Sequence, residues 1–252
     1  MFLDVLTQVV ILLILMLLGV ILAKSKVLSE QGVKSMTDMV LYTVTPCVII
    51  KSFIREFNPA TLKNLLISFL IAFLAHVGFI ILAHLLIHDS DKAKEKVLRY
   101  GIVFSNCGFM SIPLQQAILG DDGVFYASSY VAIFNLFVWS YGIILMSGDK
   151  KYLTPKKLTT NPGIIALTIG LFIFLLSIKI PKIIYEPISY MASLNTPLPM
   201  VIIGFHLASS NLLAGIRNVK YLLSLVFRLV LFPLIALGIM YLCGIRGVML
   251  VS

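Results

Sequence analysis

Residues 97–120 combine side chains whose types and spacing could bind a solute inside an apolar layer (VLRYGIVFSNCGFMSIPLQQAILG). Pro113 cannot donate a backbone hydrogen bond and its ring clashes with the preceding turn, while Gly108 lowers the cost of leaving helical geometry. Ser105 and Asn106 can bond the backbone groups that such a break frees. The stretch therefore predicts two half-helices. The N–H groups that open the second half-helix, together with the Asn106 amide, could bind a carboxylate.

Further residues could complete this anion site. Arg228 could be a counter-ion, because a charge within an apolar span is a functional candidate by default. The alternative, which the sequence alone favours, is that its long side chain reaches the membrane surface. Prolines could open the second and seventh helices beside the break. The candidate substrate-binding residues are Ser105, Asn106, Cys107, Gly108, Pro113, Pro46, Asn195, Pro197 and Arg228.

The composition excludes an ordinary soluble domain, because the 252 residues are 60% hydrophobic and only 12% charged. We therefore predict an all-α integral membrane protein. The net charge of +9 comes from basic residues in short loops, so it indicates membrane orientation and not nucleic-acid binding. The three cysteines lie in apolar segments without metal-ligand spacing, and the motifs HExxH, CxxC and GxSxG are absent. We expect no metal, no cofactor and no enzymatic activity.

Eight apolar segments are long enough to cross a bilayer. They are residues 5–23, 33–54, 64–87, 97–119, 123–147, 161–180, 187–209 and 219–243. With the N-terminus outside, thirteen basic residues fall in inside loops: Lys24, Lys26, Lys34, Lys92, Lys94, Lys96, Arg99, Lys150, Lys151, Lys156, Lys157, Arg217 and Lys220. Six fall outside: Lys51, Arg55, Lys63, Lys179, Lys182 and Arg246. This ratio favours an N-terminus outside the cell. We expect the chain to lie in the plasma membrane.

A weak internal repeat divides the chain. Thr45-Pro46 in the second predicted helix is echoed by Thr196-Pro197 in the seventh, and the two helices run in opposite directions. Similar sequence in opposite orientation is typical of an inverted repeat. We expect a first repeat of five helices at 1–147, a cytoplasmic loop at 148–160, and an incomplete second repeat of three helices at 161–252. On this interpretation eight helices are present of an expected ten, and the chain is a truncated copy.

Several motifs in order resemble the auxin efflux carrier family. The first is the break itself, Ser105 to Leu114 (SNCGFMSIPL). The others are Gly120-Asp121-Asp122-Gly123, Tyr126-Ala127-Ser128, Asn135, Gly142, Asn161-Pro162 and residues 197–204 (PLPMVIIG). This resemblance covers about residues 1–243. It implies an inverted-repeat fold with broken crossover helices, and a secondary transporter of organic anions such as malate. Cys107 and Ser111 depart from the family pattern, which commonly has Thr and Gly there.

Other functions stay open from the sequence. A carrier similar to the bile-acid/sodium symporters shares the architecture in outline, and an inactive remnant is a second alternative. The coupling ion could be a proton or sodium, and whether the chain forms a homodimer is undetermined. His76, His84 and His206 could titrate near neutral pH, although helix packing is the favoured role for each.

Overall fold

The computed structural model describes residues 2–149, 151, 160–210, 219–242 and 244, and every regular element within these ranges is helical. Six helical segments are long and apolar enough to cross a membrane. They are Leu6–Lys24, Glu30–Phe53, Pro59–Leu86, Ile112–Ser147, Lys182–Ser209 and Val219–Leu242. The chain is therefore a multi-pass α-helical membrane protein. Most of the predicted loop at 148–160, and all of 245–252, lie outside the described residues.

The N-terminal region forms α1 (Phe2–Lys24) and a second helix built from three joined pieces. These pieces are α2 (Glu30–Met39), the π-helical turn η1 (Val40–Val44) and α3 (Thr45–Phe53). Pro46 explains the wide turn, because a residue without an N–H cannot close the regular ladder. The Thr45 N–H instead donates to the Val40 carbonyl, five residues back. The second helix therefore continues through its proline without a break.

Two helices then lead to the interruption. α4 (Pro59–Leu86) begins where the Asn58 side chain accepts hydrogen bonds from the first backbone N–H groups. α5 (Lys92–Val103) begins in the same way at Asp91. α5 has only 12 residues, about 18 Å, so it cannot cross the membrane by itself.

The predicted break lies between α5 and α6. Residues 104–106 have no helical structure, and a π-helical turn, η2 (Cys107–Ser111), leads into α6 (Ile112–Phe137). α6 bends at Gly120, whose φ of 63° and ψ of −150° favour glycine. The helix continues as η3 (Val138–Gly142) and α7 (Ile143–Ser147). The predicted segment 97–119 is thus divided between α5, the break and the start of α6.

The C-terminal half has a second interruption. α9 (Pro162–Leu175) begins at the cap residue Asn161 and is a shorter apolar helix of 14 residues. α10 (Lys182–Ser193) and α11 (Pro197–Ser209) are separated by the turn at residues 194–196. The last described helix comprises α13 (Val219–Val226), η5 (Phe227–Leu231) and α14 (Phe232–Leu242). Because two of the eight predicted segments are not among the six spans, the count of eight stays a prediction.

Two interfaces dominate the packing of the described helices: α1 with α11, and α3 with α9. The first is a close backbone contact of two glycines, where a Cβ on Gly204 would lie 2.0 Å from the Met16 carbonyl oxygen. Gly19 meets the Val201 carbonyl in the same way. Small residues of this kind let membrane helices approach closely. In the second interface, Phe53 of α3 packs against Gly170 of α9.

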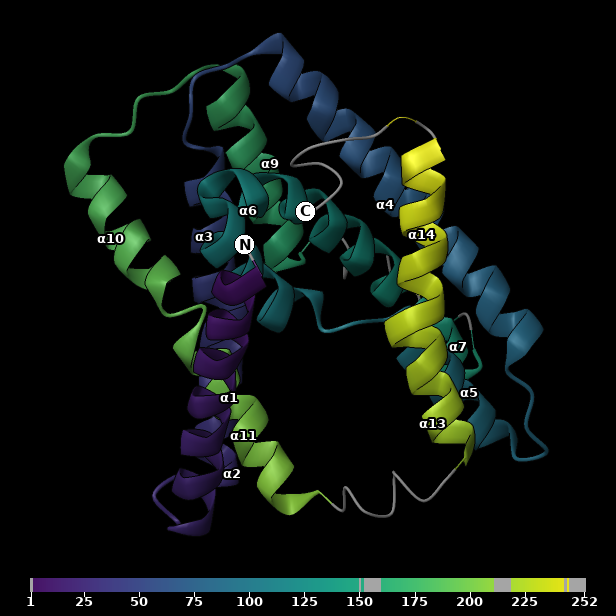
Figure 1. Cartoon of the computed structure of the whole chain (residues 1–252). Coiled ribbons are helices and arrows are strands. Elements are labelled where there is room, and N and C mark those ends of the chain that lie inside the picture. Colours follow the sequence, from purple (N-terminus) through teal and green to yellow (C-terminus); the bar gives the residue numbers. More distant parts are fainter. Residues whose placement is uncertain (1, 150, 152–159, 211–218, 243, 245–252) are drawn as a thin grey trace.

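Figure 1 shows how these pairs are arranged. α1, α2 and α11 lie together on one side, whereas α13 and α14 form a yellow column beside α4 and α5 on the other. The lower ends of α1, α11 and α13 lie at one end of the molecule, and the links from α3 to α4 and from α9 to α10 lie at the opposite end. The broken segment between α5 and α6 runs between the two groups of helices.

Candidate functional site

The end of α5 leaves backbone groups that need partners, because the last carbonyls of a helix find no N–H donor within it. Arg228 meets this need from η5, with its Nη1 donating to the Ile102 carbonyl at 2.8 Å and to the Val103 carbonyl at 3.1 Å. A cation at a helix C-terminus is also favoured by the helix dipole. Arg228 therefore binds the backbone at the break. It does not extend to the membrane surface, although the sequence alone favoured that second role.

Arg228 lies deep in its span. It is the tenth residue of the described span Val219–Leu242, so it lies about 14 Å along the helix from Val219, which is about half of a hydrocarbon core of roughly 30 Å. Its Nη1 makes both bonds to α5. The guanidinium carries three further N–H donors on Nε and Nη2, so it can bind more than one acceptor.

A cavity of about 720 Å³ adjoins this guanidinium. Its walls come from α4, the break, α6, and the last helix from Arg228 to Met240. The polar residues among them are Ser68, Ser105, Ser111, Tyr126, Ser129, Tyr130 and Arg228, and none of the described lining residues is Asp or Glu. The volume is within the range of small-molecule sites. The cavity thus offers hydroxyl groups and one positive charge to a solute.

Tyr130 organises the polar wall of the cavity. Its hydroxyl lies close to the side chains of Ser105 and Arg228, and the three line the cavity together at the break. Tyr126, Ser129 and Tyr130 lie on one face of α6, since they are spaced three and four residues apart. Ser129 and Tyr130 are not among the site residues predicted from the sequence. This polar stripe within an otherwise apolar span was the signal that could have found them.

The structure brings only some of the predicted site residues together. Ser105 and Arg228 line the cavity, whereas Asn106 is exposed and is not one of the residues that line it. The Asn106 carbonyl accepts a hydrogen bond from the Met110 N–H, four residues on, at 3.2 Å, which ties Asn106 to the start of the π-helical turn. Cys107 is buried against Val48 of α3. Gly108 and Pro113 are also not among the lining residues.

The predicted residues on the second and seventh helices form a separate polar contact. The Thr45 hydroxyl is 3.5 Å from Oδ1 of Asn195, which is only 3% exposed. Pro46 and Pro197 each lie in the first turn of the helix that follows this contact, α3 and α11. Among the described residues, none hydrogen-bonds with the Asn195 Nδ2. These three predicted residues are not among those that line the cavity.

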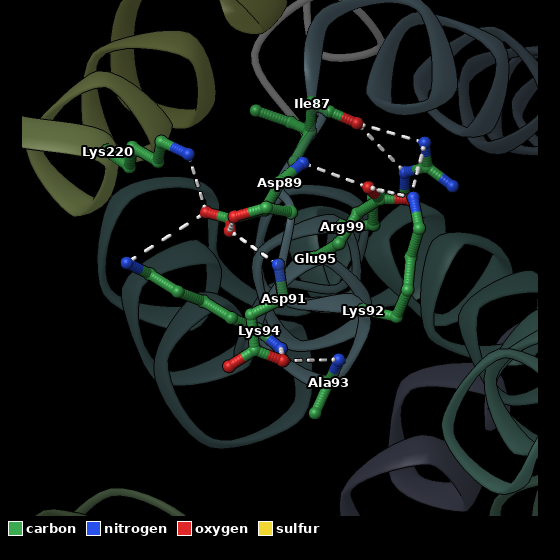
Figure 2. A network of polar contacts seen from close by, with 10 residues as sticks. Ile87, Asp89, Asp91, Lys92, Ala93, Lys94, Glu95, Arg99 and Lys220 are labelled. Carbon is green, nitrogen blue, oxygen red and sulfur yellow. Dashed lines mark hydrogen bonds and ion pairs between the residues drawn. The ribbon is translucent and has the colours of Figure 1, made fainter.

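An ion-pair network holds the base of the Arg228 helix. Figure 2 shows Asp89, in the loop between α4 and α5, with its Oδ2 2.7 Å from Nζ of Lys220 and 3.9 Å from Nζ of Lys94. Glu95 accepts from the Asp89 N–H at 2.9 Å and pairs with Arg99 at 3.0 Å. The network therefore fixes α13 against the loop and helps to place Arg228 at the break.

The same network shifts the acidity of its carboxyl groups. The hydrogen bond from Lys220 is the main cause that lowers the pKa of Asp89 to about 2, and the Asp91 N–H adds to it. The pKa of Glu95 is lowered mainly by the Asp89 N–H and then by Lys92. Both carboxylates are thus ionised throughout the physiological range.

These features define a class of protein: a multi-pass helical membrane protein with a helix interrupted beside a solute-sized cavity. A family model described as "Membrane transport protein" matches residues 4–252, so the chain belongs to this family, that of the auxin efflux carriers. It is similar to an uncharacterized transporter of Methanocaldococcus jannaschii, at 26% identity over 249 residues, which covers 95% of this chain and 80% of that protein. A second uncharacterized transporter, from Methanothermobacter thermautotrophicus, is 26% identical over 239 residues, 93% of this chain and 78% of that protein.

Proposed function

We propose that the chain is a secondary transporter of small organic anions, such as malate and other carboxylates, and that the cavity beside Arg228 is its substrate site. One observation carries this proposal: the guanidinium borders a cavity whose described lining residues include no Asp or Glu. A carboxylate that enters the membrane needs a compensating charge and hydrogen bonds, or it meets a large desolvation cost. Arg228 and the hydroxyl groups of Ser105 and Tyr130 supply both.

The break supplies the movable part of this site. Residues 104–106 leave helical geometry beside the cavity, and irregular backbone at membrane depth is stable only where protein covers it or water reaches it. Interrupted helices of this kind form midplane substrate sites in secondary transporters. Alternating access would move the two groups of helices around the break. Asn106 and the N-terminal turn of α6 would then reach the solute in a more open state.

The packing pattern supports an inverted repeat. In the proposed repeat, α1 corresponds to α9, and the second helix (α2 to α3) corresponds to the seventh (α10 to α11). The interface of α1 with α11 then exchanges with that of α3 with α9, and these two are the most extensive among the described helices. Thr45-Pro46 and Thr196-Pro197 open the second halves of the corresponding helices. The hydrogen bond between Thr45 and Asn195 would lie near the pseudo-two-fold axis.

The orientation and location are proposed from the charge distribution. An N-terminus outside the cell places the network of Asp89, Glu95, Lys92, Lys94 and Lys220 on the cytoplasmic side of a plasma membrane.

Uptake by proteoliposomes tests the substrate site through Arg228. We expect Arg228→Gln to reduce uptake of labelled malate at least tenfold, because charge-assisted hydrogen bonds contribute about 1.5–3 kcal/mol each. Arg228→Lys can still donate to the Ile102 and Val103 carbonyls, so it should stay folded. It loses the planar fork, and we expect its malate uptake to fall about tenfold.

Arg99→Gln is the matched control, since it removes an arginine of α5 that pairs with Glu95 and does not line the cavity. It should transport malate at close to the wild-type rate. Size-exclusion profiles establish that each variant is folded. A folded Arg228→Gln protein that transports malate, lactate and succinate as well as the wild type would remove Arg228 from the substrate site.

A further inference from the structure

The strongest unused feature of the molecule is His76, at the middle of α4. It is 0% exposed, and its ring is stacked on Phe137 at a centroid distance of 5.3 Å and an interplanar angle of 4°. Nδ1 lies 2.8 Å from the Ala72 carbonyl oxygen. Because a carbonyl only accepts hydrogen bonds, Nδ1 is the protonated nitrogen. Nε2 therefore carries a lone pair, and no described residue donates to it.

A buried acceptor without a hydrogen-bond partner costs desolvation free energy, so its presence calls for an explanation such as a functional role. Nε2 is a base that can take a proton and release it again, and imidazole does so near neutral pH. Within residues 57–88, 96–120, 123–148 and 219–242, which supply α4 and the helices around the cavity, the sequence contains no Asp or Glu. Carboxylates, the usual proton carriers inside membrane transporters, are thus absent from these segments.

His76 lies directly behind the wall of the cavity. Its neighbours Ala72 and Ala75 line the cavity from α4, and Tyr130, whose ring centroid is 4.8 Å away, lines it from α6. Tyr130 also lies close to Arg228 and lines the cavity with it, so one side chain lies between the histidine and the anion site.

The charged and titratable groups around His76 are few. Tyr130 faces it from α6 and Arg228 acts on it from η5, while Cys107 of η2 lies beyond Tyr130. Residues 232–242 of α14 contain no charged side chain, and His84, two turns along α4, is exposed and contacts Tyr141. In the part of the chain that the structure describes, the permanent charge that acts on His76 is therefore the Arg228 guanidinium.

We propose that His76 is the proton site of the transporter and that it couples one proton to each bound carboxylate through Arg228; this rests on the proposed function. A protonated His76 and Arg228 repel each other when the cavity is empty. An anion bound at Arg228 removes this repulsion, so proton and anion each favour binding of the other. The proton binds at Nε2 and leaves from the same atom once the anion has left. The result is symport of a proton with an organic anion.

The test uses the full chain in proteoliposomes with a trapped pH indicator. Exchange of external labelled malate for internal malate needs no net proton movement, whereas net malate entry should acidify the interior in the wild type. His76→Gln keeps a donor for the Ala72 carbonyl but cannot be protonated. We expect it to keep exchange within about twofold and to lose at least nine-tenths of malate-driven proton entry. His84→Gln, on the same helix, should keep both.

The arms of this experiment separate the two proposals. The proposed function is contradicted if the wild-type protein exchanges neither malate nor any other small carboxylate. Exchange without proton entry in the wild type, or undiminished proton entry in His76→Gln, overturns the role of His76 alone.

If His76→Gln is inactive, the pH dependence of malate binding by the wild type decides. Linkage of one proton predicts that the wild-type apparent affinity for malate rises up to ~tenfold per pH unit as pH falls from 8 to 5.5. An affinity that is constant over this range overturns the proposal.

Discussion

At the scale of single residues, Arg228 has two roles. It donates to two carbonyls at the end of α5, which stabilises the break, and it borders the cavity, where it can bind an anion. Its position was predictable from sequence, because a charge inside an apolar span is rare. Its role was not, because the alternative of reaching the membrane surface depends on which backbone groups lie within reach of the side chain.

Gly204 makes a testable residue-scale contact. A Cβ at this position would lie 2.0 Å from the Met16 carbonyl oxygen, and backbone cannot move aside as a flexible side chain can. We therefore expect Gly204→Ala to destabilise the protein by ~1–3 kcal/mol, through forced separation of α1 from α11. Thermal unfolding in detergent should show this as a midpoint several degrees lower.

Gly238→Ala is the matched control. Gly238 lies within α14, and an added Cβ would meet nothing within 4 Å. Alanine is favoured over glycine in a helix, so this variant should be as stable as the wild type or more so. If Gly204→Ala unfolds at the same temperature as Gly238→Ala, the close contact of α1 and α11 is contradicted.

At the scale of elements, the ion pair of Asp89 with Lys220 joins the loop after α4 to the base of α13. The pKa of Asp89 is lowered to about 2, chiefly by Lys220. A carboxyl whose pKa is depressed by folding contributes stability above its unfolded pKa, near 4. This contribution is lost as pH falls from there through about 2.

This sign predicts the behaviour of Asp89→Asn. The difference in unfolding temperature between wild type and variant should be constant from pH 8 to pH 5 and should shrink between pH 4 and pH 2. Lys220→Met should lower the midpoint similarly, and the double variant should add little to either single one. A difference that disappears already between pH 7 and pH 5 would show that Asp89 is not held by Lys220 in solution.

The break itself was predictable from the sequence, but its exact form was not. Proline and glycine in one span indicated that the helix is interrupted, and α5 does end at Val103. The structure resumes with a π-helical turn at Cys107 that runs directly into α6, so Pro113 follows a wide turn just as Pro46 follows η1. At Gly120 the backbone leaves helical geometry, which separates the two parts of α6 between the predicted segments 97–119 and 123–147. The form of such breaks depends on packing between helices, which local patterns do not contain.

The cavity was predictable only in part, because it too depends on packing between helices. Ser105 and Arg228 come from segments far apart in the chain, and each was conspicuous by its residue type. Tyr130 and Ser129 were not, because tyrosine and serine are common within membrane helices and Ser129 bonds its own helix at the Tyr126 carbonyl. Ser129 and Tyr130 line a cavity only because α4, α6 and α14 are arranged around the break.

At the scale of the whole molecule, the helices form two groups with the broken segment between them (Figure 1). The proposed repeat relates α1 and α11 to α9 and α3, and the hydrogen bond of Thr45 with Asn195 lies where the corresponding Thr-Pro steps approach each other. Movement of one group against the other would open the cavity to either side. The central claim is therefore that water and small anions reach the break from outside the membrane.

Cysteine labelling at Ser111, which lines the cavity, tests this claim most directly. Ser111→Cys would be made in a chain with Cys47, Cys107 and Cys243 replaced by serine. Ile239→Cys, in the same background, is a control on an exposed, apolar part of α14. Both variants would be treated in membranes with a negatively charged methanethiosulfonate reagent.

The account predicts that the thiol of Ser111→Cys reacts, and that a mixture of acetate, lactate, malate, succinate and citrate slows this reaction several-fold. The thiol of Ile239→Cys should not react, because the lipid around it excludes a charged reagent. An inert thiol in Ser111→Cys, or one that reacts at the same rate with and without carboxylates, would contradict a substrate site at the break.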